Sequence, residues 1–244
     1  MKNILVIGGA SGIGLSIATE LVQQEDCQTV HIVDRQPFPQ QFAHPKIRSH
    51  IFDLTNPDYS FFDQFADIDA LMITAGFGKI QLFRDVEDQH ITDSFYVNTI
   101  APIRIIKIFY PLLSGKKDFY CGVMGSIAGF MSSPFLSIYA STKASLKIFI
   151  ESVNVELLKA GTSNRILNVS PVFIKGTSFY KGKTDIDITR PLAIQIIQHL
   201  KNKDDLFIPK YEEVYKEVLQ RYHNDFRAEG IHSYEYKEQT MNKR

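Results

Sequence analysis

A tyrosine and a lysine four residues apart form a pair that can transfer protons. Tyr139 and Lys143 fall within a helical pattern, so their side chains share one face of the helix. An ammonium beside a phenol favours the phenolate, and lowering a tyrosine pKa from about 10 towards about 7 needs roughly 4 kcal/mol. The pair predicts a general acid/base matched to neutral pH, although about one such pair is expected by chance among 11 tyrosines and 27 basic residues.

A run of glycines near the start of the chain has the spacing of a phosphate-binding turn. It follows an expected strand (residues 2–7) and opens an expected helix (13–24), which is the context that a dinucleotide-binding site requires. Glycines let the backbone approach a pyrophosphate, and the helix N-terminus offers free N–H groups. The alternative is a simple tight turn, and the position directly after a clean strand favours the dinucleotide. The candidate contacts are Gly8, Ala10, Ser11, Gly12, Ile13 and Gly14.

Acidic residues after the second and third expected strands are candidates for the adenosine end of that cofactor. Asp34 lies twenty residues after Gly14, where a carboxylate accepts hydrogen bonds from ribose hydroxyls and repels a 2′-phosphate. Arg35 favours the opposite choice, because a guanidinium can hold that phosphate. We weigh the carboxylate more heavily and expect NAD rather than NADP, the alternative being that both residues begin a polar loop. Asp53 either meets the adenine amino group or caps a helix before Pro57.

Four motifs in this order and spacing resemble the short-chain dehydrogenase/reductase family, in its single-domain branch. The resemblance covers roughly residues 2–208. It rests on the glycines at 8, 12 and 14, the Tyr-x-x-x-Lys motif at Tyr139 and Lys143, a serine thirteen residues before the tyrosine (Ser126), and a helix asparagine (Asn98). In isolation, Ser126 would be interpreted as a strand-end serine and Asn98 as an amide bonded to backbone.

The resemblance implies a role for each of these residues. Tyr139 exchanges the proton at the substrate oxygen, and Ser126 hydrogen-bonds that oxygen. Lys143 lowers the tyrosine pKa, aided by a nearby nicotinamide charge, and holds the nicotinamide ribose; Tyr139 also contacts the cofactor. Asn98 anchors a water that links Lys143 to solvent. The chemistry of the residues agrees, since hydride transfer to a carbonyl builds negative charge on oxygen that positioned donors must meet.

The resemblance also implies further contacts from the loops after the strands. For the cofactor these are Leu54, Ala75, Gly76, Pro171 and Ile174, and for the substrate they are Ser126, Phe77, Phe130 and Phe173. The phenylalanines predict a mostly apolar pocket, closed by a substrate loop over residues 171–189. Lysines at 175, 181 and 183 could attract an acidic substrate, but we favour solvated loop lysines.

The chain departs from the family pattern in three places, of which the first two lie on adjacent strands of the family fold and the third lies in the loop that borders the nicotinamide. The family usually has threonine at Ile7 and Asn-Asn-Ala-Gly where this chain has Ile73-Thr-Ala-Gly76, so we expect an apolar Ile7–Ile73 neighbourhood to replace a polar contact. This chain has Pro171-Val172 where the family usually has Pro-Gly. In the same loop it then has Gly176-Thr177 where the family has a threonine. None of these changes touches the proton-transfer residues.

Short apolar runs that alternate with helical patterns must position all these groups. Seven near-continuous runs are typical of strands buried on both faces, so we expect a doubly wound, Rossmann-like parallel sheet with helices on both faces. Two long helical patterns cover residues 88–113 and 138–160. The second is apolar around more than one face, which indicates burial against the sheet and against either a loop or a neighbouring subunit.

We expect one cofactor-binding and catalytic domain over residues 1–208 and a charged tail over 209–244. The recurrence of Val214, Val218 and Tyr222 predicts an amphipathic helix in the first half of the tail, and residues from 230 onward are expected to be disordered. The tail carries five of the eleven tyrosines. It either packs across a partner's active site or covers the open edge of the sheet after the last strand, and we favour the second.

Composition excludes several other classes of protein. Hydrophobic residues are 44% and the formal net charge is +0, which argues against disorder and against nucleic acid as a partner. Two separated cysteines and scattered histidines support neither a disulfide framework nor a metal site. No apolar run approaches the ~18 residues of a membrane span, so no membrane contact is expected and the expected location is the cytoplasm.

The sequence therefore predicts an NAD(P)-dependent oxidoreductase that interconverts a carbonyl and a secondary alcohol, as a homodimer or homotetramer built through the two long helices. The first alternative is a non-catalytic NAD(H)-binding sensor or scaffold on the same fold. The second is an epimerase or dehydratase of the extended branch, which the ~70 residues after Pro171 are too few to support.

Overall fold

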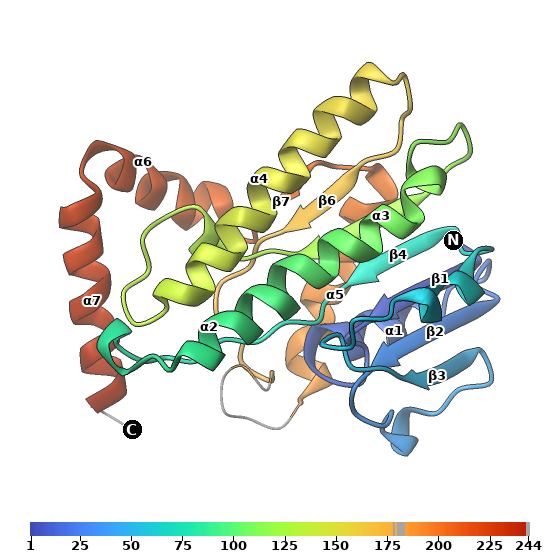
Figure 1. Cartoon of the computed structure of the whole chain (residues 1–244), viewed down its shortest axis with the longest axis horizontal. Coiled ribbons are helices and arrows are strands. Elements are labelled where there is room, and N and C mark those ends of the chain that lie inside the picture. Colours follow the sequence, from blue (N-terminus) through green and yellow to red (C-terminus); the bar gives the residue numbers. More distant parts are fainter. Residues whose placement is uncertain (178, 180–183, 243–244) are drawn as a thin grey trace.

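Seven parallel strands form a single sheet in the computed structural model, which describes residues 1–177, 179 and 184–242, with no side chains described beyond 239. Their order across the sheet is β3-β2-β1-β4-β5-β6-β7. The expected doubly wound architecture is thereby confirmed (Figure 1). The strands are β1 (Asn3–Ile7), β2 (Thr29–Asp34), β3 (Ile47–Ile51), β4 (Ala70–Ile73), β5 (Tyr120–Met124), β6 (Ile166–Val169) and β7 (Leu206–Phe207).

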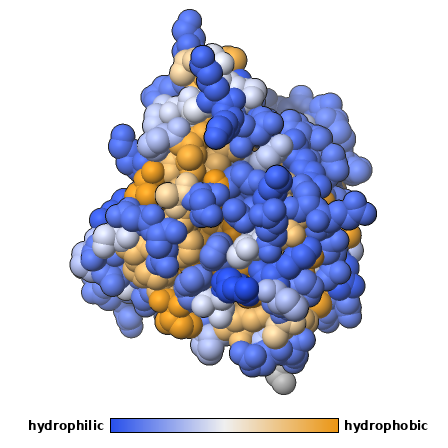
Figure 2. Space-filling view, turned by 90° about the vertical axis from the view of Figure 1, so that its right-hand side faces the viewer, coloured by the Kyte–Doolittle hydropathy of each residue, from blue (hydrophilic) through white to orange (hydrophobic). Residues whose placement is uncertain are grey.

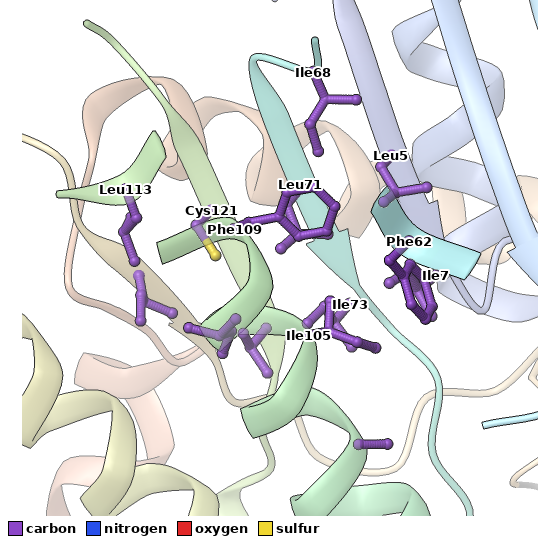
Figure 3. Packing of buried hydrophobic residues seen from close by; sticks show 14 of the residues in the cluster. Leu5, Ile7, Phe62, Ile68, Leu71, Ile73, Ile105, Phe109, Leu113 and Cys121 are labelled. Atoms are coloured by element: carbon purple, nitrogen blue, oxygen red, sulfur yellow. The ribbon is translucent and has the colours of Figure 1, made fainter. Parts of the chain in front are cut away.

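Helices cover both faces of this sheet because the central strands are apolar on both sides. On β1, Ile4 and Val6 pack in one cluster with α1 (Gly12–Leu21) and α5 (Ile186–Asn202). Leu5 and Ile7 point to the other face and pack with the helices there (Figure 3). That second layer contains α2 (Asp88–Phe95), α3 (Ala101–Leu113) and α4 (Ser137–Lys159). Alternate side chains on a strand face opposite ways, so one apolar run supplies two cores.

The helical pattern expected over residues 88–113 forms one element with an irregular centre. A π-helical turn at Tyr96–Ile100 separates α2 from α3 and carries the buried Asn98. Such turns insert one extra residue into a helix and occur frequently at functional sites.

The outer face of α4 is exposed rather than covered by a loop. Ile148, Val155 and Leu158 expose 58–61% of their surface, whereas Leu146, Ile150 and Leu157 are buried against the core. Figure 2 shows the molecule from the right-hand side of Figure 1, with hydrophobic residues gathered in a band. Of the two interpretations for this helix, burial under a loop of the same chain is therefore wrong.

The segment after β6 becomes helical earlier than expected. The loop was predicted to extend to residue 189, but α5 begins at Ile186, because the Asp185 carboxylate caps it by accepting from the N–H groups of Asp187 and Ile188. Lys175 is described and lies on an exposed turn, whereas Lys181 and Lys183 fall outside the described residues.

The tail folds over the carboxyl edge of the sheet, and the expectation that it is disordered from residue 230 onward is wrong. Residues from 230 onward are helical, within α7 (Phe226–Asn242), which follows α6 (Lys216–Asn224) (Figure 1). Instead of covering the edge beside β7, α7 is fixed to the loop after β5. The Tyr234 and Phe135 rings lie 4.7 Å apart, and Lys237 donates to the Ser133 hydroxyl at 2.8 Å. These contacts order the tail.

The departures at Ile7 and Ile73 have a compensating neighbour. The two residues are register partners on β1 and β4, and both are buried in the same apolar cluster. The hydroxyl of Thr74 donates to the carbonyls of Ile7 and Gly8 at 2.9 and 3.0 Å. The expected apolar neighbourhood of Ile7 and Ile73 is therefore present, and Thr74 adds a polar contact to the backbone beside it.

Cys27 and Cys121 are buried free thiols. Among the described residues, no group of three histidine, cysteine or acidic side chains could hold a metal ion. Within the same part of the chain, no helix has the length and apolar character needed to cross a membrane.

Candidate active site

A cavity of about 830 Å³ lies at the carboxyl edge of the sheet, where the loops after β1 to β6 converge. Parallel strands bring all their carboxyl ends to one edge, so residues far apart in sequence meet there. The cavity is lined by most of the residues singled out from the sequence: Gly8, Ser11, Gly12, Ile13, Gly14, Asp34, Arg35, Asp53, Leu54, Ala75, Gly76, Phe77, Ser126, Tyr139, Lys143, Pro171, Phe173 and Ile174.

The glycines after β1 form a cradle that no side chain could enter. A Cβ at Gly8 would lie 2.5 Å from the Ala75 nitrogen, and one at Gly14 would lie 2.3 Å from the Gly8 carbonyl oxygen. Gly12 has φ +54°, and its N–H donates to the Thr184 hydroxyl at 3.0 Å. That bond shows that an N–H of the first turn of α1 can reach an oxygen acceptor outside the helix. The turn therefore fits a diphosphate, because a diphosphate needs a backbone that it can approach closely and N–H groups that are free to donate to it.

Two carboxylates are fixed by backbone donors at the far end of the cavity. Asp34 accepts from the N–H groups of Ala10 and Gln36, each at 3.0 Å. Ala10 itself is buried away from the cavity, so it holds Asp34 rather than lining the cavity as expected. Asp53 accepts from the N–H and hydroxyl of Thr55 at 2.9 Å, and the N–H bond is the main cause of its lowered pKa. Each carboxylate keeps lone pairs for a further donor.

Tyr139 lies on the first turns of α4, with its ring at the border of the cavity and bonded to Ser126. Burial raises the pKa of its phenol to about 12, and the hydrogen bond with Ser126 opposes that rise. The Ser126 hydroxyl also accepts from the N–H of Ala128 at 3.2 Å. Tyr139 is consequently a neutral phenol at pH 7, a proton donor beside a second hydroxyl.

Lys143 is buried one turn further along α4, and its ammonium is directed at the backbone. Its Nζ donates to the carbonyl of Met124 at 2.7 Å and lies 5.7 Å from the centre of the Tyr139 ring. Burial lowers the pKa of this amine to about 8, so it is still mostly charged at pH 7. The expected lowering of the Tyr139 pKa by Lys143 is not observed here. Burial dominates the pKa of the phenol, and the ammonium bonds to the Met124 carbonyl rather than to the phenol.

Asn98 occupies the π turn and clamps two elements of the site together. Its amide donates to the Phe77 carbonyl at 2.8 Å and to the Thr142 hydroxyl at 3.2 Å, and its oxygen accepts from the Phe77 N–H at 2.9 Å. A Cβ at Gly76 would lie 3.1 Å from the Asn98 oxygen and 3.4 Å from Lys143 Nζ. Asn98 therefore stands behind Gly76 and positions the loop after β4 rather than facing the cavity.

The substrate side of the cavity differs from expectation at Phe130. The Phe130 ring lies outside the cavity lining, and the Lys147 ammonium lies over it at 5.0 Å from the ring centre. The residues that follow Phe130 in the loop line the cavity instead. Met131, Ser132, Ser133 and Phe179, from the two loops expected to contact the substrate, do line the cavity. Residues that the sequence reasoning missed complete the wall: Leu136, Val214, Tyr215, Val218, Glu229, His232, Ser233, Tyr236 and Lys237. The spacing of the last five, at helical intervals, is the signal that could have revealed them.

Comparisons with known proteins agree with this arrangement. A family model described as short chain dehydrogenase matches residues 2–186. A Saccharomyces cerevisiae protein, "Uncharacterized oxidoreductase TDA5", is 25% identical over 80% of this chain, and the chain spans 64% of that relative's length. Human 17-beta-hydroxysteroid dehydrogenase type 1 is 27% identical over 43% of this chain and 32% of its own. A solved short chain dehydrogenase from Burkholderia cenocepacia, in complex with NADP, has TM-score 0.76 and 18% identity, covering 96% of this chain and 99% of its own.

Proposed function

The chain belongs to the short-chain dehydrogenase family, and from this premise we propose that it interconverts a carbonyl compound and a secondary alcohol with a nicotinamide cofactor. The observation that carries the proposal is the meeting of the Tyr139 phenol, the Ser126 hydroxyl and the buried Lys143 in one cavity with the glycine cradle. The cofactor, when bound, supplies the hydride or accepts it. The residues of the chain supply the proton and the hydrogen bonds.

The proposed roles follow from how each hydroxyl is held. The substrate oxygen binds between Tyr139 and Ser126, where both hydroxyls can donate to the negative charge that develops on it. Tyr139 then gives up its proton, and the Lys143 ammonium, 5.7 Å from the centre of the ring, attracts the phenolate across that distance without a direct hydrogen bond. Because burial raises the tyrosine pKa to about 12, the phenol is already protonated at pH 7 and reduction needs no prior proton uptake.

We propose NAD(H) as the preferred cofactor, held at the glycine cradle and at Asp34. The Asp34 carboxylate is fixed by two backbone donors and lines the cavity, where it would repel a 2′-phosphate. Arg35 is exposed and interacts with Asp53, whose pKa it helps to lower, so part of its charge is already balanced. Two similar solved proteins carry NADP, so NADPH is the cofactor to compare. Dissociation constants for NADH and NADPH, with wild type and Asp34→Ser, test the preference.

The exposed apolar face of α4 supports a homodimer or homotetramer. Ile148, Val155 and Leu158 lie on its outer side, and Ile100 at the start of α3 is 42% exposed. Covering such a face with a second copy would remove this apolar surface from water. Light scattering on wild type and on Val155→Lys tests this part of the proposal, and a monomeric wild type would refute it.

The activity itself is tested by cofactor oxidation with a panel of ketones. We expect turnover with wild type and a loss of about tenfold or more in kcat for Ser126→Ala, whose hydroxyl is proposed to meet the substrate oxygen. Ser137→Ala, on an exposed position at the start of α4, is the matched control and should retain full activity. A protein that binds NADH yet oxidises it with no ketone would support the non-catalytic alternative.

A further inference from the structure

The last helix of the chain presents a polar face to the cavity. On α7, Glu229, His232, Ser233, Tyr236 and Lys237 all line the cavity and recur at helical spacing. The face opposite includes exposed residues such as Ile231 and Glu235. His232 and Tyr236 stay exposed while they line the cavity, whereas Glu229 is buried and Lys237 is half-buried.

The charges on this face do not cancel within the chain. Glu229 is buried, and Arg221 on α6 neutralises it through two hydrogen bonds of 2.8 and 3.3 Å. His232 lies 3.9 Å from the same carboxylate. Lys237, in contrast, donates to two neutral oxygens, the Ser133 hydroxyl at 2.8 Å and the Pro134 carbonyl at 2.9 Å. Among the described residues, no carboxylate lies within ion-pair distance of it.

The surroundings of Lys237 make an uncompensated charge costly. The lining of the same cavity includes the apolar and aromatic side chains of Met131, Phe173 and Val218. Burial lowers the pKa of the Lys237 amine to about 8, because the ammonium loses hydration there. An ammonium has three donors, and two are used by neutral groups. An anion that entered the cavity would gain a strong, partly desolvated partner.

We propose that α7 is the substrate-recognition wall of the enzyme and that Lys237 binds an anionic group, such as a carboxylate, on a substrate with an apolar body. The inference rests on the proposed function, because it assumes that the substrate oxygen reacts at Tyr139 and Ser126 in the same cavity. It defines the substrate class as keto acids or hydroxy acids whose apolar body contacts the aromatic walls.

A purely structural role for Lys237 makes a different prediction. If its bonds to Ser133 and Pro134 only fixed α7, removing them would loosen the wall for every substrate equally. Recognition of an anion predicts instead an effect confined to charged substrates and located in KM. The two roles are therefore separated by paired substrates that differ only in charge.

The experiment compares 4-acetylbenzoate and 4-benzoylbutyrate with their methyl esters, using wild type, Lys237→Gln and Lys237→Arg. We expect wild type to prefer each acid over its ester by about tenfold or more in kcat/KM. Lys237→Gln should abolish the preference by raising KM for the acids alone, and Lys237→Arg should restore it. Lys216→Gln, an exposed lysine of α6 outside the cavity, is the matched control.

The outcomes separate this inference from the function on which it rests. Turnover of ketone esters with no preference for the acids, or equal losses for acid and ester in Lys237→Gln, would refute anion recognition and leave the reductase activity standing. No turnover of any ketone would refute the proposed function itself. An increase in the thermal midpoint with 4-phenylbutyrate that is absent in Lys237→Gln supports the inference independently of turnover, and an equal increase in both proteins would count against it.

Discussion

Replacing Lys143 by methionine is expected to stabilise the protein while inactivating it. The lysine is buried, and its pKa falls from 10.5 to about 8, so the folded state binds the proton more weakly than the unfolded chain does. A shift of this size corresponds to a destabilisation of about 3 kcal/mol at pH 7. The penalty is fully present below pH 8 and is relieved as pH rises from 8 to 10.5, because the unfolded state binds more protons in that window.

Methionine removes this penalty but also removes the hydrogen bond to the Met124 carbonyl, which is worth about 1 kcal/mol. The net gain in the free energy of unfolding is therefore about 2 kcal/mol at pH 7 and below about 1 kcal/mol at pH 9.5. Urea unfolding of wild type and Lys143→Met at both pH values, without added cofactor, measures the difference.

Lys147→Met is the control, because this ammonium lies one turn further along α4 and pairs with Glu151 at 2.8 Å. It should give no pH-dependent gain. A Lys143→Met protein that is less stable than wild type at pH 7, or whose advantage grows with pH, would show that Lys143 is not held as a costly buried charge. The reasoning about the polarity of the active site would then be wrong.

Other parts of the site give further expectations. Gly14→Ala should lower the thermal midpoint and abolish NADH binding, because its Cβ would lie 2.3 Å from a carbonyl oxygen; unchanged binding in a titration would contradict the cradle. Asn98→Leu should destabilise the fold by about 2–5 kcal/mol in urea unfolding, because it leaves the Phe77 N–H and carbonyl unpaired; a loss below about 1 kcal/mol would argue against the clamp. Reduction of a neutral ketone should decline as pH rises above about 8, where Lys143 loses its proton, and a pH–rate profile that stays flat to pH 10 would exclude the ammonium from the mechanism.

Local sequence patterns were sufficient to predict the sheet and the cofactor end of the site. The apolar runs on β1 and β4 are continuous because both faces are buried, so their limits can be recognised in the sequence. The parallel order then brings Asp34, Ser126 and Tyr139 to one edge without any further information. The glycine spacing is equally local, because a Cβ would collide within the turn itself.

The properties that depend on tertiary contacts could not be predicted in this way. Whether the pKa of the Tyr139 phenol is raised by burial or lowered by Lys143 depends on where the ammonium points. It points to the Met124 carbonyl, and burial therefore raises the pKa. The end of the tail was expected to be disordered because chain termini are poorly ordered unless contacts hold them, and such contacts cannot be recognised in the sequence. Only the fold shows that Glu229 and Lys237 face inward.

The central claim is that the Tyr139 phenol transfers the proton in a cavity that also binds the cofactor. Its most direct test is to measure NADH binding and ketone reduction side by side for Tyr139→Phe and wild type. We predict that the variant binds NADH as tightly as wild type and loses turnover by about 10²–10⁴-fold. Turnover that persists near the wild-type rate in the variant would contradict the account.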